Sequence, residues 1–144
     1  MLAVTLSLFG FNACNNDDNI NNNNSTETTL ENSTNKEITY EIISQAQAKE
    51  IMDSSENYVI VDARTSEEFS EGHIKNAINL DYEEVTQKAE SLLPDKNQLI
   101  LIYCRSGRRS KIAAESLCQL GYTNVKEFGG IIDWQYEVVK DGNW

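Results

Sequence analysis

The chain has 144 residues, enough for one ordinary domain with tails, and 40% of them are hydrophobic. Its formal net charge is -11, from 23 acidic and 12 basic residues. This acidity argues against a nucleic-acid-binding protein, because most of the surface would repel phosphate.

The first 13 residues form an apolar segment with the length of a signal-peptide core, too short to cross a bilayer as a helix. It ends in Phe-Asn-Ala-Cys, which resembles the lipobox of bacterial lipoproteins, so we expect a signal peptide over 1–13 and a lipid on Cys14. The alternative is an apolar terminus with an incidental cysteine. Residues 14–37 are rich in Asn, Thr, Ser and acidic residues and predict a disordered tether. The lipid would hold the protein on a membrane of the bacterial cell envelope, on its extracytoplasmic side.

From residue 38 to residue 144 the pattern predicts one α/β domain. Continuous apolar runs at 58–62 and 98–103 are typical of parallel strands that are buried on both faces. In chain order, we expect a strand at 38–43, a helix at 45–54 capped by Ser44, a strand at 58–62, a helix at 66–72 capped by Ser66, a strand at 77–80, a helix at 81–93, a strand at 98–103, a helix at 109–121 that stops at Gly121, a strand at 124–128 and a closing helix at 130–139.

Strands that alternate with helices predict βαβ crossovers, and hence a mainly parallel sheet of about five strands with helices on both faces. In such sheets, ligands bind at the carboxyl ends of the strands. Polar residues directly follow two of the predicted strands, at 62–64 and at 104–110. These two segments form the candidate site.

The segment 104–110, Cys-Arg-Ser-Gly-Arg-Arg-Ser, places positive charge around a cysteine in an acidic chain. If the chain turns here and enters a helix, the N–H groups of the turn and of the helix N-terminus converge on Cys104. Gly107 lets the backbone turn close to a bound group. The helix dipole and the nearby cations then favour a reactive Cys104 thiolate without a histidine base. The alternative is an inert buried thiol with arginines on the surface.

Three blocks of sequence, in this order, resemble the rhodanese-like domain family. They are Val-Asp-Ala-Arg through Ile-Asn-Leu at 61–80, Tyr-Cys-Arg-Ser-Gly-Arg-Arg-Ser at 103–110, and Phe-Gly-Gly-Ile-Ile-Asp-Trp at 128–134. The resemblance covers nearly all of the segment 38–137 and implies a three-layer α/β/α fold. Asn76 and Asp81 depart from the family pattern, in which glycine and proline are usual, and both lie away from the loop.

The length of the loop separates two chemistries on this fold. The related cysteine phosphatases place an arginine six residues after the cysteine, where this chain has Ser110. Arg109 stands one position earlier, which gives the six-residue loop that the resemblance associates with sulfur transfer. The resemblance therefore implies a thiosulfate sulfurtransferase that carries a persulfide on Cys104.

The resemblance also implies roles for the residues around Cys104. Arg105 and Arg108 are expected to face an anionic sulfur donor, and Arg109 is expected to hold the end of the loop. The remaining loop residues, whose N–H groups would hold the persulfide and the leaving anion, are Ser106, Gly107 and Ser110.

Outside the loop, we expect Asp62 and Arg64 to pair and brace it, with direct substrate contact by Arg64 as the alternative. His73 is expected to be structural, and Trp134 is expected to anchor the closing helix in the core. Cys118 is expected to pack in the core, with a resolving cysteine as the alternative.

The implied partners are a small anionic donor similar to thiosulfate, and an acceptor that is cyanide in vitro or a thiol in the cell. We expect no cofactor, no nucleic acid and a monomer, and no Cys/His spacing predicts a metal site. A second hypothesis is a membrane-tethered persulfide carrier that delivers sulfur to a partner protein and has little turnover of its own.

Overall fold

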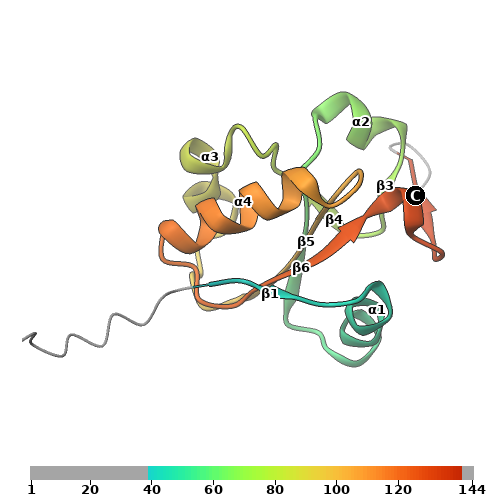
Figure 1. The fold of residues 1–144 in the computed structure, drawn as a ribbon, viewed down its shortest axis with the longest axis horizontal. Coiled ribbons are helices and arrows are strands. Elements are labelled where there is room, and N and C mark those ends of the chain that lie inside the picture. Colours follow the sequence, from blue (N-terminus) through green and yellow to red (C-terminus); the bar gives the residue numbers. More distant parts are fainter. Residues whose placement is uncertain (1–38, 141–144) are drawn as a thin grey trace, which may run out of the picture. The chain divides into compact units, whose positions relative to one another are not determined.

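The computed structural model describes residues 39–140 (Figure 1). The predicted signal peptide, Cys14 and the tether at 14–37 lie outside the described residues and stay predictions. Between residues 39 and 140, no helix has both the length and the apolar character needed to cross a membrane. The elements follow in the order β1 (Glu41–Ile42), α1 (Gln45–Ser54), β2 (Tyr58–Asp62), α2 (Ser66–Glu71), β3 (His73–Ile74), β4 (Ala77–Asn79), α3 (Val85–Leu92), β5 (Leu99–Cys104), α4 (Arg108–Gln119), β6 (Val125–Gly130), the 3-10 turn η1 (Ile131–Asp133) and β7 (Val138–Val139).

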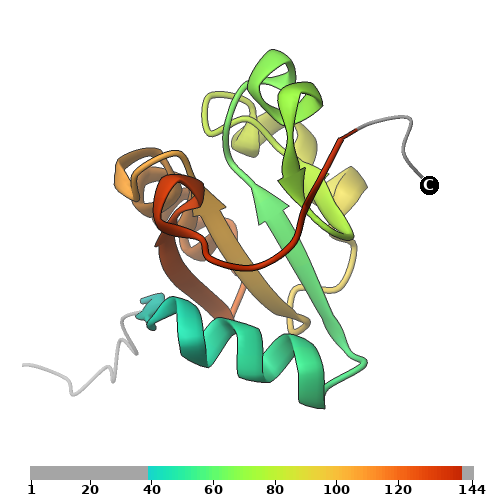
Figure 2. The same cartoon turned by 90° about the vertical axis from the view of Figure 1, so that its right-hand side faces the viewer.

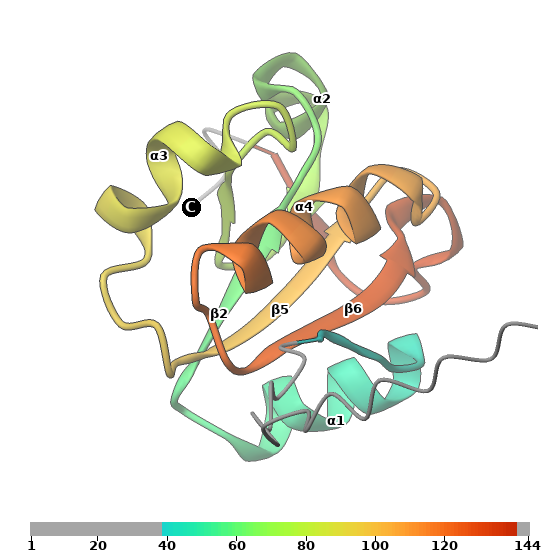
Figure 3. The same cartoon turned by 60° about the vertical axis from the view of Figure 1, so that its left-hand side comes forward.

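Five strands form the central sheet in the order β1-β6-β5-β2-β4, and each neighbouring pair is parallel. Helices α3 and α4 cover one face of this sheet, and α1 lies across the other face (Figures 1 and 3). The expected three-layer α/β/α fold with a mainly parallel, five-stranded sheet is therefore confirmed. Strand β5, which carries Cys104, lies at the centre of the sheet.

Alternate residues of β5 contribute to the two halves of the core, which explains the continuous apolar run in the sequence. Ile100 and Ile102 pack with residues of α3 and α4, whereas Leu101 and Tyr103 pack on the side of α1. All four side chains are 0% exposed. Cys104 ends the strand on the same side as α4, so the core itself fixes which way its thiol faces.

Capping boxes begin the first two helices. Ser44 caps α1 as predicted, and its side chain accepts the N–H of Gln47. Helix α2 is capped by Thr65 and not by the predicted Ser66, because Thr65 Oγ1 accepts the N–H of Glu68 at 3.3 Å. Glu68 lies three residues after Thr65 and completes the capping box. Ser66 has no Glu or Gln three residues after it, so it cannot form such a box.

Two predicted elements are several residues shorter in the structure. Strand β1 spans only Glu41–Ile42, and α3 begins at Val85 and not at residue 81. The carboxylate of Asp81 accepts the N–H of Glu83 at 3.1 Å, which turns the chain before the helix starts.

The prediction of a closing helix at 130–139 was wrong. The chain there makes only the turn η1 and then the short strand β7, which pairs antiparallel with β3. Figure 2 shows this last segment crossing one face of the sheet to reach β3. Trp134 does pack in the core, but it follows a 3-10 turn instead of anchoring a helix. Periodicity in a short apolar run does not distinguish a helix from a strand, and the paired valines of β7 favour the strand.

Candidate active site

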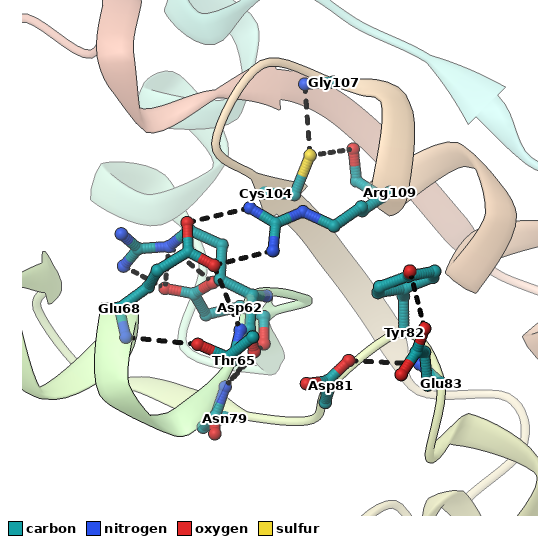
Figure 4. Close-up of polar contacts among 12 residues, drawn as sticks. Asp62, Thr65, Glu68, Asn79, Asp81, Tyr82, Glu83, Cys104, Gly107 and Arg109 are labelled. Atoms are coloured by element: carbon teal, nitrogen blue, oxygen red, sulfur yellow. Dashed lines mark hydrogen bonds and ion pairs between the residues drawn. The ribbon is translucent and has the colours of Figure 1, made fainter.

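The loop after β5 lies at the carboxyl edge of the sheet, with Cys104 at its start (Figure 4). Helix α4 begins at Arg108, one position before the predicted start. Gly107 precedes the helix with a φ of 94°, a left-handed conformation that glycine adopts without strain. Arg105 and Ser106 fill the loop between strand and helix and are exposed.

Hydrogen-bond donors surround the sulfur of Cys104, a residue that is only 1% exposed. The N–H of Gly107 donates to Sγ at 3.1 Å, and the hydroxyl of Ser110 lies 3.4 Å from Sγ. Burial alone would raise the pKa of the Cys104 thiol, but the hydrogen bonds from the Ser110 hydroxyl and from the N–H groups of Ser110, Ser106 and Gly107 outweigh it. The pKa of Cys104 is therefore lower than its usual value, which favours a thiolate.

The guanidinium of Arg109 pairs with the carboxylate of Glu68 on α2 (Figure 4). Its two terminal nitrogens donate to the two carboxylate oxygens at 2.6 and 2.8 Å. This bidentate pair joins the first turn of α4 to α2 and neutralises one of the three arginines of the loop segment. Arg105 and Arg108 are exposed, so they are the cations left to face an anion.

Asp62 and Arg64 form a buried ion pair after β2, as the sequence predicts. Arg64 donates from Nε to both Asp62 oxygens at 2.9 and 3.0 Å, and from Nη2 to Oδ2 at 2.6 Å. Nη2 also donates to the carbonyl oxygen of Gly72 at 2.7 Å. These bonds connect the end of β2 to the start of β3, so the pair stabilises the strand ends beside the loop and its hydrogen bonds do not reach the loop itself.

Strand β6 supplies two residues of the site that the sequence analysis did not identify as functional, Glu127 and Gly130. Glu127 is 1% exposed, and its Oε1 lies 2.7 Å from the hydroxyl of Ser110 beneath the loop. A Cβ atom on Gly130 would lie 2.2 Å from the carbonyl oxygen of Arg105, so only glycine fits against the loop. A signal for Glu127 was present, because the period of a strand places it on the same inward face as Val125.

His73 and Cys118 lie in structural positions. The His73 ring stacks on Phe69 with centroids 3.8 Å apart, and its Nδ1 lies 3.0 Å from the carbonyl oxygen of Phe69. Cys118 lies on α4 and packs in the core, where burial, together with the charge of Glu115, raises the pKa of its thiol. Across residues 39–140, no three Cys, His, Asp or Glu side chains come together as a metal site.

Comparison with known proteins identifies similar chains. A family model described as the rhodanese-like domain matches residues 44–137. The chain is 38% identical over 80 residues to the thiosulfate sulfurtransferase PspE of Escherichia coli. This match covers 56% of this chain and 77% of PspE. It is 34% identical over 95 residues to the putative sulfurtransferase YtwF of Bacillus subtilis, and this match covers 66% of this chain and 90% of YtwF.

Solved structures show the same fold. A rhodanese from E. coli, solved with anions, matches with a TM-score of 0.54 and 36% identity over 58% of this chain and 98% of that one. A rhodanese-related protein from Thermoplasma volcanium matches with a TM-score of 0.60 and 33% identity, over 69% of this chain and 98% of that one.

Proposed function

The chain belongs to the rhodanese-like domain family, and on this premise we propose that it transfers sulfane sulfur from thiosulfate or a similar anion to a thiol through a persulfide on Cys104. Its relatives are sulfurtransferases, which supports sulfur transfer in general. The choice of donor and acceptor is the part that we propose.

In the first half-reaction, the Cys104 thiolate attacks the outer sulfur of thiosulfate. A bond forms between Sγ and that sulfur, the bond from the outer sulfur to the central sulfur breaks, and sulfite leaves with the electron pair. In the second half-reaction, a thiolate or cyanide attacks the outer sulfur of the persulfide, and Cys104 leaves as a thiolate. This is covalent, ping-pong catalysis.

The observation that carries the proposal is the set of donors around Cys104 Sγ. The Gly107 N–H bond and the nearby Ser110 hydroxyl favour an anionic sulfur at the end of β5. The exposed side chains of Arg105 and Arg108 raise the local concentration of an anionic donor despite the acidity of the whole chain. Oriented N–H groups then hold the persulfide as it forms.

The position of Arg109 argues against a phosphatase. Phosphoryl transfer needs a cation at the transferring oxygens, and here the guanidinium of Arg109 is paired with Glu68. Ser110 occupies the next position and is 0% exposed. The loop therefore suits a sulfur atom better than a tetrahedral phosphate.

The test is intact-mass spectrometry of the protein after incubation with thiosulfate. We expect the mass of one added sulfur atom, lost on addition of cyanide, and absent in Cys104→Ser. Cys118→Ser is the matched control, because Cys118 lies in the same core but away from the loop donors, and it should keep the added sulfur. Persulfide formation that survives Cys104→Ser would overturn the proposal.

A second candidate is a persulfide carrier that delivers sulfur to a partner protein. It is favoured by the exposure of Arg105, Ser106 and Arg108, which leaves the loop open to a protein surface. Rapid formation of thiocyanate from thiosulfate and cyanide alone would count against this candidate. Slow turnover that a partner protein accelerates would support it.

We also propose that Cys14 carries a lipid that tethers the domain to a membrane of the cell envelope, on its extracytoplasmic side. The support is the apolar segment and the Phe-Asn-Ala-Cys sequence. Membrane fractionation of the full chain tests it, since Cys14→Ser should move the protein to the soluble fraction. A Cys14→Ser protein that stays with membranes would contradict it.

A further inference from the structure

A buried carboxylate lies beneath the active-site loop, and one hydroxyl links it to the sulfur. Glu127 and Cys104 are each 1% exposed, and Ser110 is 0% exposed. The Ser110 hydroxyl lies 2.7 Å from Glu127 Oε1 and 3.4 Å from Cys104 Sγ. Strand β6, helix α4 and strand β5 thus each contribute one member of a chain of three polar groups.

A serine hydroxyl has one hydrogen, so Ser110 can donate to Glu127 or to Cys104 but not to both. When Cys104 is a thiol, its S–H can donate to the Ser110 oxygen while Ser110 donates to Glu127. When Cys104 is a thiolate, both ends of the chain are acceptors, and one of them loses the Ser110 hydrogen. Formation of the thiolate therefore costs a buried hydrogen bond.

Repulsion between the negative charges of Glu127 and Cys104 also disfavours the thiolate. The two bonds place Sγ and Oε1 within about 6 Å of each other, in a buried region where charges are weakly screened. Oε1 also accepts the N–H of Gly129 at 2.9 Å. Two donors that converge on one oxygen suit an ionised carboxylate, which opposes a second negative charge on the sulfur.

We propose that Glu127 is a positioning residue that competes with the Cys104 thiolate for the hydrogen of Ser110, and so sets the pH above which Cys104 becomes reactive. The inference rests on the proposed function only in taking Cys104 as the nucleophile. Ionisation breaks the S–H bond, leaves the electron pair on sulfur and passes the proton to water, so no oxidant or reductant is needed.

Other groups act on the same balance. The loop N–H groups and Arg109 of α4 favour the thiolate, although Arg109 is already paired with Glu68. Tyr40 precedes β1, and burial raises the pKa of its phenol. The nearby charges of Glu115 and Cys118 on α4, and of Glu127, raise this pKa further. All of these groups stay in place when Glu127 alone is changed.

Glu127→Gln is the decisive variant. Glutamine keeps the shape and an oxygen that can accept from Ser110 and Gly129, but it removes the charge and is the weaker competitor. We expect the midpoint of Cys104 reactivity to fall by about one pH unit. At a pH well below both midpoints, Cys104 should then react about 10-fold faster in the variant than in the wild type.

The assay is the rate of alkylation by iodoacetamide across a pH series, with peptide mass spectrometry to read the label on Cys104 alone. No sulfur donor takes part, so failure here is distinct from failure of sulfur transfer. Glu115→Gln is the matched control, because it removes one negative charge from the exposed face of α4, and its profile should follow the wild type. An unchanged or raised midpoint in Glu127→Gln would overturn the inference.

A second variant protects the test against loss of folding. Glu127→Met places an unbranched apolar side chain on the face of β6 that carries Val125, a residue of the core. It frees Ser110 to donate to the sulfur and removes the charge, so the midpoint should again fall. If the midpoint in Glu127→Met stays at the wild-type value, the inference is wrong.

Discussion

Replacing Gly130 by alanine should displace the active-site loop. A Cβ atom at this position would lie 2.2 Å from the carbonyl oxygen of Arg105 and 2.5 Å from the Cα of Ser106. Both atoms belong to the backbone, so no side-chain rotation relieves the contact. Because nonbonded carbon atoms pack at about 3.5 Å, the loop must move by about 1 Å. The same movement strains the bond from the Ile132 N–H to the Arg105 oxygen, which measures 3.2 Å.

The displacement should reduce activity more than stability. Overpacking of this kind costs about 1–3 kcal/mol of unfolding free energy, so the domain should still fold. A 1 Å misplacement of reacting groups costs about 100-fold in rate, because the loop N–H groups no longer meet the sulfur. The assay is the rate of thiocyanate formation from thiosulfate and cyanide, measured beside a thermal melt of the same protein.

Gly129→Ala is the matched control for this experiment. Gly129 has a φ of 97°, so alanine there is strained by about 1–2 kcal/mol, but the nearest atom to its Cβ would be Gln45 Nε2 at 3.8 Å. We expect a similar loss of stability and most of the activity retained. If Gly130→Ala keeps its rate within about threefold of the wild type, or if both variants lose the same activity, close packing against the loop is not what positions it.

Three further substitutions test the surroundings of the loop. Thr65→Ala removes the cap of α2 and should cost about 1 kcal/mol in urea unfolding, and an unchanged midpoint would mean that the cap adds no stability. Arg64→Ala leaves the Asp62 carboxylate, 0% exposed, without its cation, and should cost about 3–5 kcal/mol, so a loss well under 1 kcal/mol would contradict the ion-pair argument. The hydrogen bonds from Arg109 lower the pKa of Glu68, so this pair stabilises the fold above the usual Glu range and the stabilisation is lost as the pH falls through the lowered pKa. Thermal melts should therefore separate Glu68→Gln from the wild type at neutral pH and converge in acid, and a constant gap at all pH values would refute this.

The sequence was sufficient to predict the sheet because its main strands are marked locally. The apolar runs of β2 and β5 reflect burial on both faces, and each is followed by polar residues at the carboxyl edge. The strands β3 and β7 were missed because each has only two residues and is stable only through the other. Their pairing depends on where the chain lies after β6, which periodicity does not encode.

Part of the candidate site could likewise be predicted from the sequence, whereas another part depends on tertiary packing. Cys104, Gly107 and Ser110 lie in one continuous segment, so their convergence follows from a strand end, a turn and a helix start. Glu68 and Glu127 join it from α2 and β6, and only tertiary packing brings them to the loop. Arg109 was expected to hold the end of the loop, but the sequence did not indicate that Glu68 of α2 would be its partner.

These contacts assign different tasks to backbone and side chains around the sulfur. N–H groups of the loop favour the anion on Cys104, and the buried hydroxyl of Ser110 links that anion to Glu127. The pairing of Arg109 leaves Arg105 and Arg108 as the exposed cations of the loop segment. Attraction of an anionic donor should therefore depend on salt, whereas ionisation of the buried sulfur should depend on it much less, because screening acts mainly on exposed charges. We therefore expect added salt to lower the rate of sulfur transfer by raising KM. The alkylation midpoint of Cys104 should stay unchanged over the same range of salt.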